Sequence, residues 1–178
     1  MANLYLVTGP AGVGKSTISF KIAEKCEKSA VIEGDTIYNQ VVGSYQSAWK
    51  EGNHLDLFWE LSVKNIQTYL DHGYDVVFNY IIKPETLDFI KQNVNADLIK
   101  LVVLLVDDEV LLQRDAERPE DCQMKERCIT LLNNFRKRNY NKNNILDTTN
   151  LSVSETVDAV VNEDRFILNW CLMCIDIL

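Results

Sequence analysis

At residues 9–16 the chain reads Gly9-Pro10-Ala11-Gly12-Val13-Gly14-Lys15-Ser16, which matches the pattern G-x-x-x-x-G-K-[ST] in full. The stretch directly follows an apolar run, Leu4 to Val7, and directly precedes a segment with apolar residues at helical spacing. A glycine-rich turn between a strand and a helix is the context that a phosphate-binding loop (P-loop) requires. A chance glycine-rich turn is the alternative, and the complete motif in this context argues against it.

The residue types of this loop suit the phosphates of ATP. Glycines such as Gly12 and Gly14 let successive backbone N–H groups converge on phosphate oxygens at a helix N-terminus, whose dipole favours anions. Lys15 is expected to act in catalysis by bringing positive charge to the β- and γ-phosphates. The Ser16 hydroxyl is placed to coordinate Mg²⁺, with Thr17 as a second hydroxyl. We therefore expect the segment from Gly9 to Thr17 to bind ATP with Mg²⁺.

Short apolar runs alternate with helix-length amphipathic segments along the whole chain, as in α/β proteins whose crossover helices cover both faces of a parallel sheet. The five expected strands are Leu4–Val7, Ala30–Ile32, Val76–Phe78, Leu101–Val106 and Ile145–Leu146. With 178 residues, 47% of them hydrophobic, the chain can bury one sizeable core. The expected architecture is a single α/β domain over residues 1–178, in three layers.

Two segments between the strands stand out as functional additions. Residues 36–72 contain two expected helices, no strand and many aromatic residues, which indicates a helical insertion that binds the phosphoryl acceptor. Aromatic residues at such spacing also commonly belong to a core. A further helical stretch from Glu109 to Asn139 is interrupted at Pro119, so we expect a mobile lid over about residues 114–127.

Composition excludes several classes of partner and site. The net charge of −8 opposes binding to the phosphate backbone of nucleic acids. The N-terminus lacks the pattern of a secretory signal, and five scattered cysteines fit reduced thiols, so a cytoplasmic protein is expected. The apolar tail at 166–178 is too short to span a membrane and is expected to pack on the domain or on a partner. The sequence does not indicate the oligomeric state.

Asp35 is the candidate for handling the acceptor. It follows the second expected strand in the sequence Glu33-Gly34-Asp35, and the carboxyl ends of parallel strands face the ligand crevice. Its carboxylate is able to accept the proton of the attacking hydroxyl, to orient that hydroxyl, or to hold Mg²⁺. The alternative is that Asp35 caps a helix that starts at Thr36.

The expected lid carries three arginines, Arg114, Arg118 and Arg127. Their guanidinium groups match the oxygens of a transferring phosphoryl group, and closure of the lid would exclude water. Pairing with acidic neighbours such as Glu117, Asp121 and Glu126 is the alternative.

Two further motifs bear on the choice of nucleotide and metal. The stretch Asn141-Lys142-Asn143-Asn144 lacks the aspartate of the guanine-binding Asn-Lys-x-Asp motif, which favours ATP over GTP. The third strand ends in Phe78-Asn79-Tyr80, so an amide occupies the place where many P-loop enzymes carry a metal-associated aspartate.

The chain resembles the small P-loop kinases that include gluconate kinase, shikimate kinase, chloramphenicol phosphotransferase and the zeta-toxin kinases, with ATP binding of the AAA type. The resemblance spans about residues 3–161. It rests on the following stretches: Gly9 to Ser16, Glu33 to Asp35, Leu112 to Pro119, Leu146 to Thr149, and Leu151 to Glu155.

This resemblance implies a P-loop NTPase fold with strand order 2-3-1-4-5. It also implies a lid with phosphate-binding arginines, of which Arg118 and Arg127 are assigned to catalysis, and an adenine pocket beside Arg114 and Thr148. The chain departs from gluconate kinases in lacking a His-Pro after Asp35, and from zeta toxins in lacking an arginine there.

The sequence as a whole predicts an ATP-dependent kinase that phosphorylates a hydroxyl of a small molecule, such as a sugar acid like gluconate. Two alternatives remain open at this point. One is an ATP-binding regulatory or interaction module without kinase activity, which the missing metal-associated aspartate favours. The other is a zeta-toxin-like kinase that acts on a nucleotide sugar.

Overall fold

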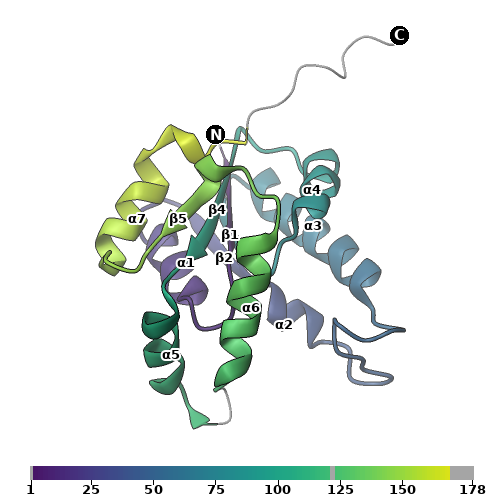
Figure 1. The fold of residues 1–178 in the computed structure, drawn as a ribbon. Helices are drawn as coiled ribbons and strands as arrows, with labels where there is room; N and C mark the ends of the chain where they lie inside the picture. Colours follow the sequence, from purple (N-terminus) through teal and green to yellow (C-terminus); the bar gives the residue numbers. More distant parts are fainter. Residues whose placement is uncertain (1, 121–122, 169–178) are drawn as a thin grey trace.

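The computed structural model describes residues 2–120 and 123–168 and contains one five-stranded parallel sheet (Figure 1). The strands lie in the order β2-β3-β1-β4-β5, which confirms the α/β class, the five strands and the strand order implied by the resemblance. Their bounds are Asn3–Thr8 (β1), Ser29–Glu33 (β2), Asp75–Asn79 (β3), Leu98–Leu105 (β4) and Ile145–Asp147 (β5). The prediction for the apolar tail falls outside the described residues from position 169 onward.

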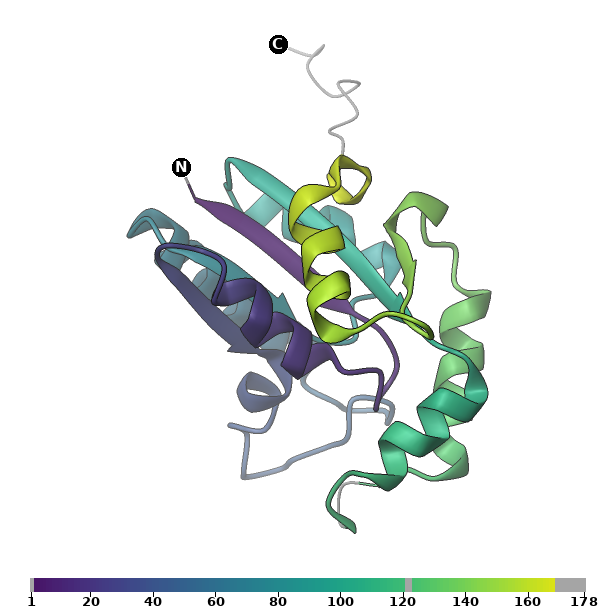
Figure 2. The ribbon, with the colours of Figure 1, turned by 90° about the vertical axis from the view of Figure 1, so that its left-hand side faces the viewer.

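Alternate side chains of the central strands feed two separate cores. In β1, Leu4 and Leu6 face one core, whereas Tyr5 and Val7 face the other. Helices α1 (Lys15–Ala23) and α7 (Val153–Asn162) cover the second of these faces, and Figure 2 shows both in front of the sheet. Because β1 is apolar on both faces, it can form only as a buried central strand.

The other face of the sheet is covered by α3 (Leu55–Asp71) and α4 (Leu87–Asn93), which pack against the first core (Figure 1). Between β2 and α3 lie the short helix α2 (Gly34–Tyr38) and a loop, so residues 36–72 contain no strand. The stretch 109–139 is divided into α5 (Asp108–Ala116) and α6 (Glu126–Lys137), on either side of Pro119. None of the described helices combines the length and hydropathy that crossing a bilayer requires.

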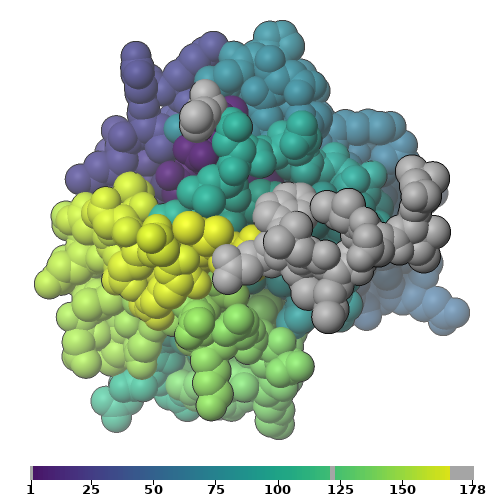
Figure 3. All heavy atoms as spheres, turned by 90° about the horizontal axis from the view of Figure 1, so that it is seen from above, coloured from purple at the N-terminus to yellow at the C-terminus, as the bar shows by residue number. Residues whose placement is uncertain are grey.

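The carboxyl ends of β1, β2 and β3 meet at one edge of the sheet. Asn79, the last residue of β3, pairs with Val7 of β1 on one side and with Glu33 of β2 on the other. Ligands of open parallel sheets bind beyond this edge. Seen from above, the dark purple atoms of β1 show only as a small area between later segments, which illustrates how deeply this strand is enclosed (Figure 3).

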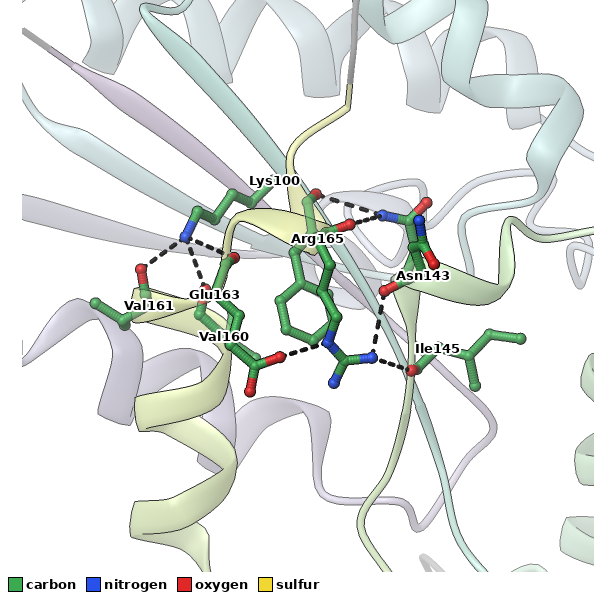
Figure 4. Close-up of polar contacts among 9 residues, drawn as sticks. Lys100, Asn143, Ile145, Val160, Val161, Glu163 and Arg165 are labelled. Carbon is green, nitrogen blue, oxygen red and sulfur yellow. Dashed lines mark hydrogen bonds and ion pairs between the residues drawn. The ribbon is translucent and has the colours of Figure 1, made fainter.

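A buried lysine ties the end of α7 to the sheet. Lys100 of β4 is 4% exposed, and its Nζ donates hydrogen bonds to the carbonyl oxygens of Val160 (3.2 Å), Val161 (2.6 Å) and Glu163 (3.2 Å) (Figure 4). These carbonyls belong to the last turn of α7 and the residue after it, which have no partners inside the helix. A cation at a helix C-terminus also suits the helix dipole.

Replacing Lys100 should therefore destabilise the fold. We expect Lys100→Met to lower the free energy of unfolding by about 1–3 kcal/mol, because the carbonyls at the end of α7 lose their donor while staying buried. Urea denaturation measures the change. Lys21→Met is the control: its side chain is 52% exposed in a surface pair with Glu24, so it should cost no more than about 1 kcal/mol. Equal losses in the two variants would contradict this account.

Candidate functional site

A cavity of about 540 Å³ lies beyond the carboxyl edge of the sheet, over the P-loop. Its walls come from the P-loop and the start of α1, from α2 and the end of β3, from α5 and the residues directly after it, and from the loop after β5 with the start of α7. The lining residues that the sequence had indicated are Ala11, Gly12, Val13, Gly14, Lys15, Ser16, Thr17, Asp35, Asn79, Arg114, Arg118 and Thr148. Residues that are far apart in the sequence thus share one cavity.

Glycine is required in the P-loop for two different reasons. A Cβ at Gly9 would lie 2.5 Å from the carbonyl oxygen of Leu104 in β4, so the loop packs too closely on the sheet for any side chain. Gly14 has φ 99°, a left-handed conformation that side chains disfavour, at the point where α1 begins. Gly9 and Pro10 do not line the cavity; they shape the loop whose later residues do.

Lys15 lies in the cavity wall with its ammonium group held by the loop itself. Its Nζ donates to the carbonyl oxygen of Pro10 at 2.9 Å. Burial lowers the pKa of Lys15 to about 8, and Arg118 adds to this effect, while the carboxylate of Asp35 opposes it. An ammonium that is costly to keep charged in an empty cavity gains when an anion binds beside it.

Asp35 is exposed and lies in the first turn of α2, two residues beyond β2. The helix begins at Gly34 with Glu33 in the N-cap position, so Asp35 does not cap it and the capping alternative is wrong. Gly34 packs on the ring of Tyr80, where a Cβ would lie 2.6 Å from the ring. Burial, together with the nearby charge of Asp35, raises the pKa of Tyr80. This packing directs α2, and with it Asp35, over the cavity.

Oxygen donors suited to Mg²⁺ gather in the same place. The Ser16 hydroxyl and the Asp35 carboxylate both line the cavity, and Thr17 lies beside Ser16. Among the described residues, no three His, Cys, Asp or Glu side chains cluster as a self-sufficient metal cage. Magnesium in phosphate-transfer sites commonly takes one or two protein oxygens and completes its shell with phosphates and water, so this donor set fits the ion.

Arg114 links three segments at the opposite end of the cavity. It donates to the carbonyl oxygens of Val13 in the P-loop (3.3 Å) and of Thr148 after β5 (3.2 Å), and to the Thr148 hydroxyl (3.4 Å). The Thr148 hydroxyl in turn donates to Leu105 of β4 at 3.2 Å. Beyond this pair, Leu151, Val153 and Thr156 add apolar surface. Arg114 and the neighbouring side chains thus provide a part of the cavity suited to a flat, partly apolar group.

Arg118 is held by a buried carboxylate that the sequence analysis did not single out. Asp115 is 2% exposed and accepts hydrogen bonds from the Arg118 guanidinium (3.1 Å) and from the backbone N–H groups of Met124 (2.8 Å) and Lys125 (2.7 Å). Burial pushes the pKa of Asp115 upward, but these hydrogen bonds outweigh it and hold that pKa below its ordinary value. One carboxylate therefore fixes both the arginine and the start of α6.

The signal for Asp115 was its spacing, because positions i and i+3 of a helix lie on one face. That face can be recognised as buried only once α5 is seen against Gly12, whose Cβ position lies 3.8 Å from the Asp115 carboxylate. Glu117, considered above as a partner of the arginines, instead lines the cavity.

Arg127 lies apart from the other two arginines. Its guanidinium stacks 4.4 Å from the ring centre of Trp49, in the loop between α2 and α3, and it does not line the cavity. Trp49 is 68% exposed, so this contact lies at the surface. It joins the start of α6 to the loop after α2, which also contains Tyr45. A catalytic role for Arg127 stays a prediction.

The charge of the cavity contrasts with that of the chain. Lys15, Arg114 and Arg118 face Asp35 and Glu117, so cations outnumber carboxylates here although the whole chain carries a net charge of −8. Cavity walls of low dielectric strengthen such a local field. The site thus favours an anion at the P-loop.

Loss of the Asp115 charge should loosen the α5–α6 connection. We expect Asp115→Asn to lower the free energy of unfolding by about 1–3 kcal/mol, because an amide cannot accept all the hydrogen bonds that the carboxylate accepts. Trypsin should cut faster after Lys125, as mass spectrometry would show. Since the pKa of Asp115 is depressed in the fold, its stabilisation is present above about pH 4 and is lost as the pH falls through the folded-state pKa.

The control for this variant is Asp108→Asn. Asp108 pairs with Arg136 at the surface, where the carboxylate is 49% exposed, so its loss should cost at most about 1 kcal/mol. Trypsin cleavage after Lys125 that stays at the unaltered rate in Asp115→Asn would show that the carboxylate does not hold this segment.

Comparison with known proteins supports the assignment of the fold. Residues 4–138 match the family model described as an AAA domain. Among curated proteins, none matches this sequence significantly.

Three solved structures superpose over most of the chain. A tunicamycin resistance protein from Deinococcus radiodurans has a TM-score of 0.67 at 17% identity and covers 96% of this chain and 100% of its own. A sugar kinase from Janibacter sp. has a TM-score of 0.65 at 14% identity, covering 90% and 93%. A gluconokinase from Sinorhizobium meliloti has a TM-score of 0.63 at 17% identity, covering 89% and 90%.

The family match covers more than half of the chain, and the strand order and the P-loop agree with it. This protein therefore belongs to the AAA domain family and has the fold of the small P-loop kinases.

Proposed function

We propose that this protein transfers the γ-phosphoryl group of ATP, bound with Mg²⁺, to a hydroxyl group of a small molecule. The observation that carries the proposal is the shared cavity, which brings together Lys15 of the P-loop, Asp35 after β2 and Arg118, two residues after α5. A P-loop alone would indicate only nucleotide binding. A carboxylate and an arginine in the same cavity supply the additional groups that phosphoryl transfer uses.

Different parts of the cavity would bind the adenine, the phosphates and the acceptor. The adenine of ATP would lie at the end formed by Arg114, Thr148 and Leu151, and the phosphates would lie along the P-loop from Gly12 to Ser16. The exposed carboxylate of Asp35 would then face the γ-phosphate from the far side. With the nucleotide bound in this way, the acceptor would lie between Asp35 and the aromatic residues of the loop after α2.

In the proposed reaction the acceptor oxygen forms a bond to the γ-phosphorus while the bond from that phosphorus to the β,γ-bridging oxygen breaks. Asp35 accepts or orients the proton of the attacking hydroxyl, and Lys15 and Arg118 neutralise charge on the phosphoryl oxygens. Ser16 and Asp35 are the residues that would hold Mg²⁺, which supplies further positive charge to the phosphates. The segment 114–127 would act as a lid that excludes water.

The names of two structural neighbours and one exposed ring near Asp35 in the sequence support a proposal for the acceptor class. Two of the superposed proteins are a sugar kinase and a gluconokinase, so sugars and sugar acids such as gluconate are the first candidates. Tyr38, three residues after Asp35, is buried and packs with Tyr45 and His54, with ring centres 4.1–6.0 Å apart. Tyr45 is 44% exposed, so its ring is the one open to the apolar face of a sugar.

A nucleotide-binding regulatory module is the second candidate. One observation favours it: an amide, Asn79, lies in the cavity at the end of β3 where a carboxylate would strengthen metal binding. Such a protein would bind ATP tightly without phosphorylating any acceptor.

The kinase proposal is tested with Mg-ATP and a panel of sugars, sugar acids, nucleosides and aminocyclitols, with ADP release and mass spectrometry as readouts. We expect one class to be phosphorylated. On that acceptor, Asp35→Ala should lower kcat by about 100-fold or more while ATP affinity changes little. Lys15→Ala should abolish nucleotide binding in calorimetry. Asp88→Ala, an exposed aspartate of α4 outside both the nucleotide cavity and the segment 36–72, is the control and should behave as the unaltered protein.

Two results would refute parts of this proposal. Tight ATP binding without turnover of any panel compound would favour the regulatory module. Full turnover by Asp35→Ala would remove Asp35 from the mechanism.

ATP affinity should depend on pH through Lys15. Its pKa of about 8 in the free protein should rise when phosphates bind, so above pH 8 binding must take up a proton. We expect affinity to be nearly constant from about pH 7 to 8 and to fall up to about tenfold for each further pH unit. Calorimetry in buffers with different ionisation heats would show proton uptake at about pH 9. Uptake that is equal at pH 7 and pH 9 would contradict the assignment to Lys15.

A further inference from the structure

The last residue of β3 has a buried amide that the fold does not use. Asn79 is 5% exposed, and its Nδ2 atom is buried and has no hydrogen-bond partner among the described residues. The rest of the strand interior, Val76, Val77 and Phe78, is fully apolar and buried. An unpaired buried donor costs free energy that an apolar residue of the same shape would avoid. An unpaired donor in the wall of a cavity can take a partner from outside the chain once a turn about χ2 brings the amide nitrogen to the cavity.

The position of Asn79 indicates which ligand supplies that partner. Asn79 lines the same cavity as Lys15, Ser16 and Asp35. It pairs in the sheet with Val7, two residues before the P-loop begins, and with Glu33, two residues before Asp35. It therefore lies between the group that binds the β- and γ-phosphates and the group proposed to face the acceptor. The ligand atoms expected at that point are the oxygens of the phosphoryl group being transferred.

The chemistry of the side chain agrees with this location. The unpaired atom is a nitrogen that can only donate, and phosphoryl oxygens can only accept. A carboxylate at this position would accept a hydrogen bond from a metal-bound water, but it would repel the phosphoryl oxygens directly. A neutral amide instead contributes a donor without adding charge to a cavity that already contains three cations.

We propose that the Asn79 amide donates a hydrogen bond to an oxygen of the γ-phosphoryl group and so distinguishes ATP from ADP. The inference rests on the proposed ATP site but requires no knowledge of the acceptor. Asn79 thereby replaces the usual acidic residue at this strand end with a donor that binds the transferred group itself. Without a nucleotide the amide is a cost to the fold, and with ATP it is satisfied.

The test compares three side chains of nearly equal shape at position 79: Asn, Leu and Asp. The comparison separates a donor to the γ-phosphoryl group from a purely structural amide and from a partner of metal-bound water. The test measures the affinities for ATP and ADP by calorimetry with saturating Mg²⁺, and stability without nucleotide by urea denaturation. We expect Asn79→Leu to weaken ATP binding roughly tenfold while ADP binding changes less than about twofold, because only ATP has the γ-phosphoryl group. Asn79→Asp should weaken ATP binding further, through repulsion.

The stability measurement identifies a purely structural amide. Without nucleotide, Asn79→Leu should be as stable as the unaltered protein or more stable, since no hydrogen bond is lost. The control is Asn144→Leu: Asn144 is 3% exposed but donates to Arg165 and Phe166, both at 3.4 Å, outside the nucleotide cavity. It should lose stability and keep the ATP-to-ADP affinity ratio.

Several outcomes would overturn the inference. Equal effects of Asn79→Leu on ATP and ADP, or no effect on either, would remove the contact with the γ-phosphoryl group. Tighter Mg-ATP binding by Asn79→Asp, at lower Mg²⁺ concentrations, would assign the residue to the water shell of the metal ion. Destabilisation of nucleotide-free Asn79→Leu would make the amide structural. Absence of ATP binding by the unaltered protein would overturn both this inference and the proposed function, whereas ATP binding with no role for Asn79 overturns this inference alone.

Discussion

The close packing of the P-loop on the central strands is the constraint on which the rest of the structure depends. The chain leaves β1, turns at Gly9 and enters α1 at Lys15. The turn lies so close to β4 that a Cβ on Gly9 would be 2.5 Å from the carbonyl oxygen of Leu104. That turn aims the N–H groups at the start of α1 toward one point beyond the sheet edge. Every other group of the cavity is positioned by a strand or helix that pairs with or packs on β1 and its neighbours.

The nucleotide end of the cavity is held together by cross-links between segments far apart in sequence. Arg114 of α5 joins the P-loop to the loop after β5, and Asp115, next to it, fixes Arg118 and the start of α6. Helix α5, with Arg114, and the segment directly after it, with Arg118, are thus tied down at several points. Such preorganised cations lose little entropy when an anion binds. This end of the site suits a ligand part that does not vary, such as a nucleotide.

The end proposed to bind the acceptor is built differently. Asp35 lies on a helix of five residues, and the loop that follows α2 exposes Tyr45 and Trp49. The contact between Trp49 and Arg127 is a surface cation–π pair, a weak tie of about 0.5–1 kcal/mol at exposed sites. Several hydrogen bonds hold the end near Arg114, whereas a weak surface contact holds the end near Asp35. This difference is consistent with a fold in which the nucleotide is constant and the acceptor differs between proteins. Fold similarity alone therefore does not identify the acceptor.

The local pattern of residues was enough to predict the P-loop, the five strands and the break at Pro119, because each depends on neighbours in the sequence: glycine spacing, apolar runs and a proline. The strand order followed from the resemblance to a family. Three features came only from the folded chain: the burial of Asp115 against Gly12, the unpaired amide of Asn79, and the stacking of Arg127 on Trp49. Each depends on which residues distant in sequence become neighbours, since burial and hydrogen-bond satisfaction are properties of the packed structure and are not encoded in any short stretch of residues.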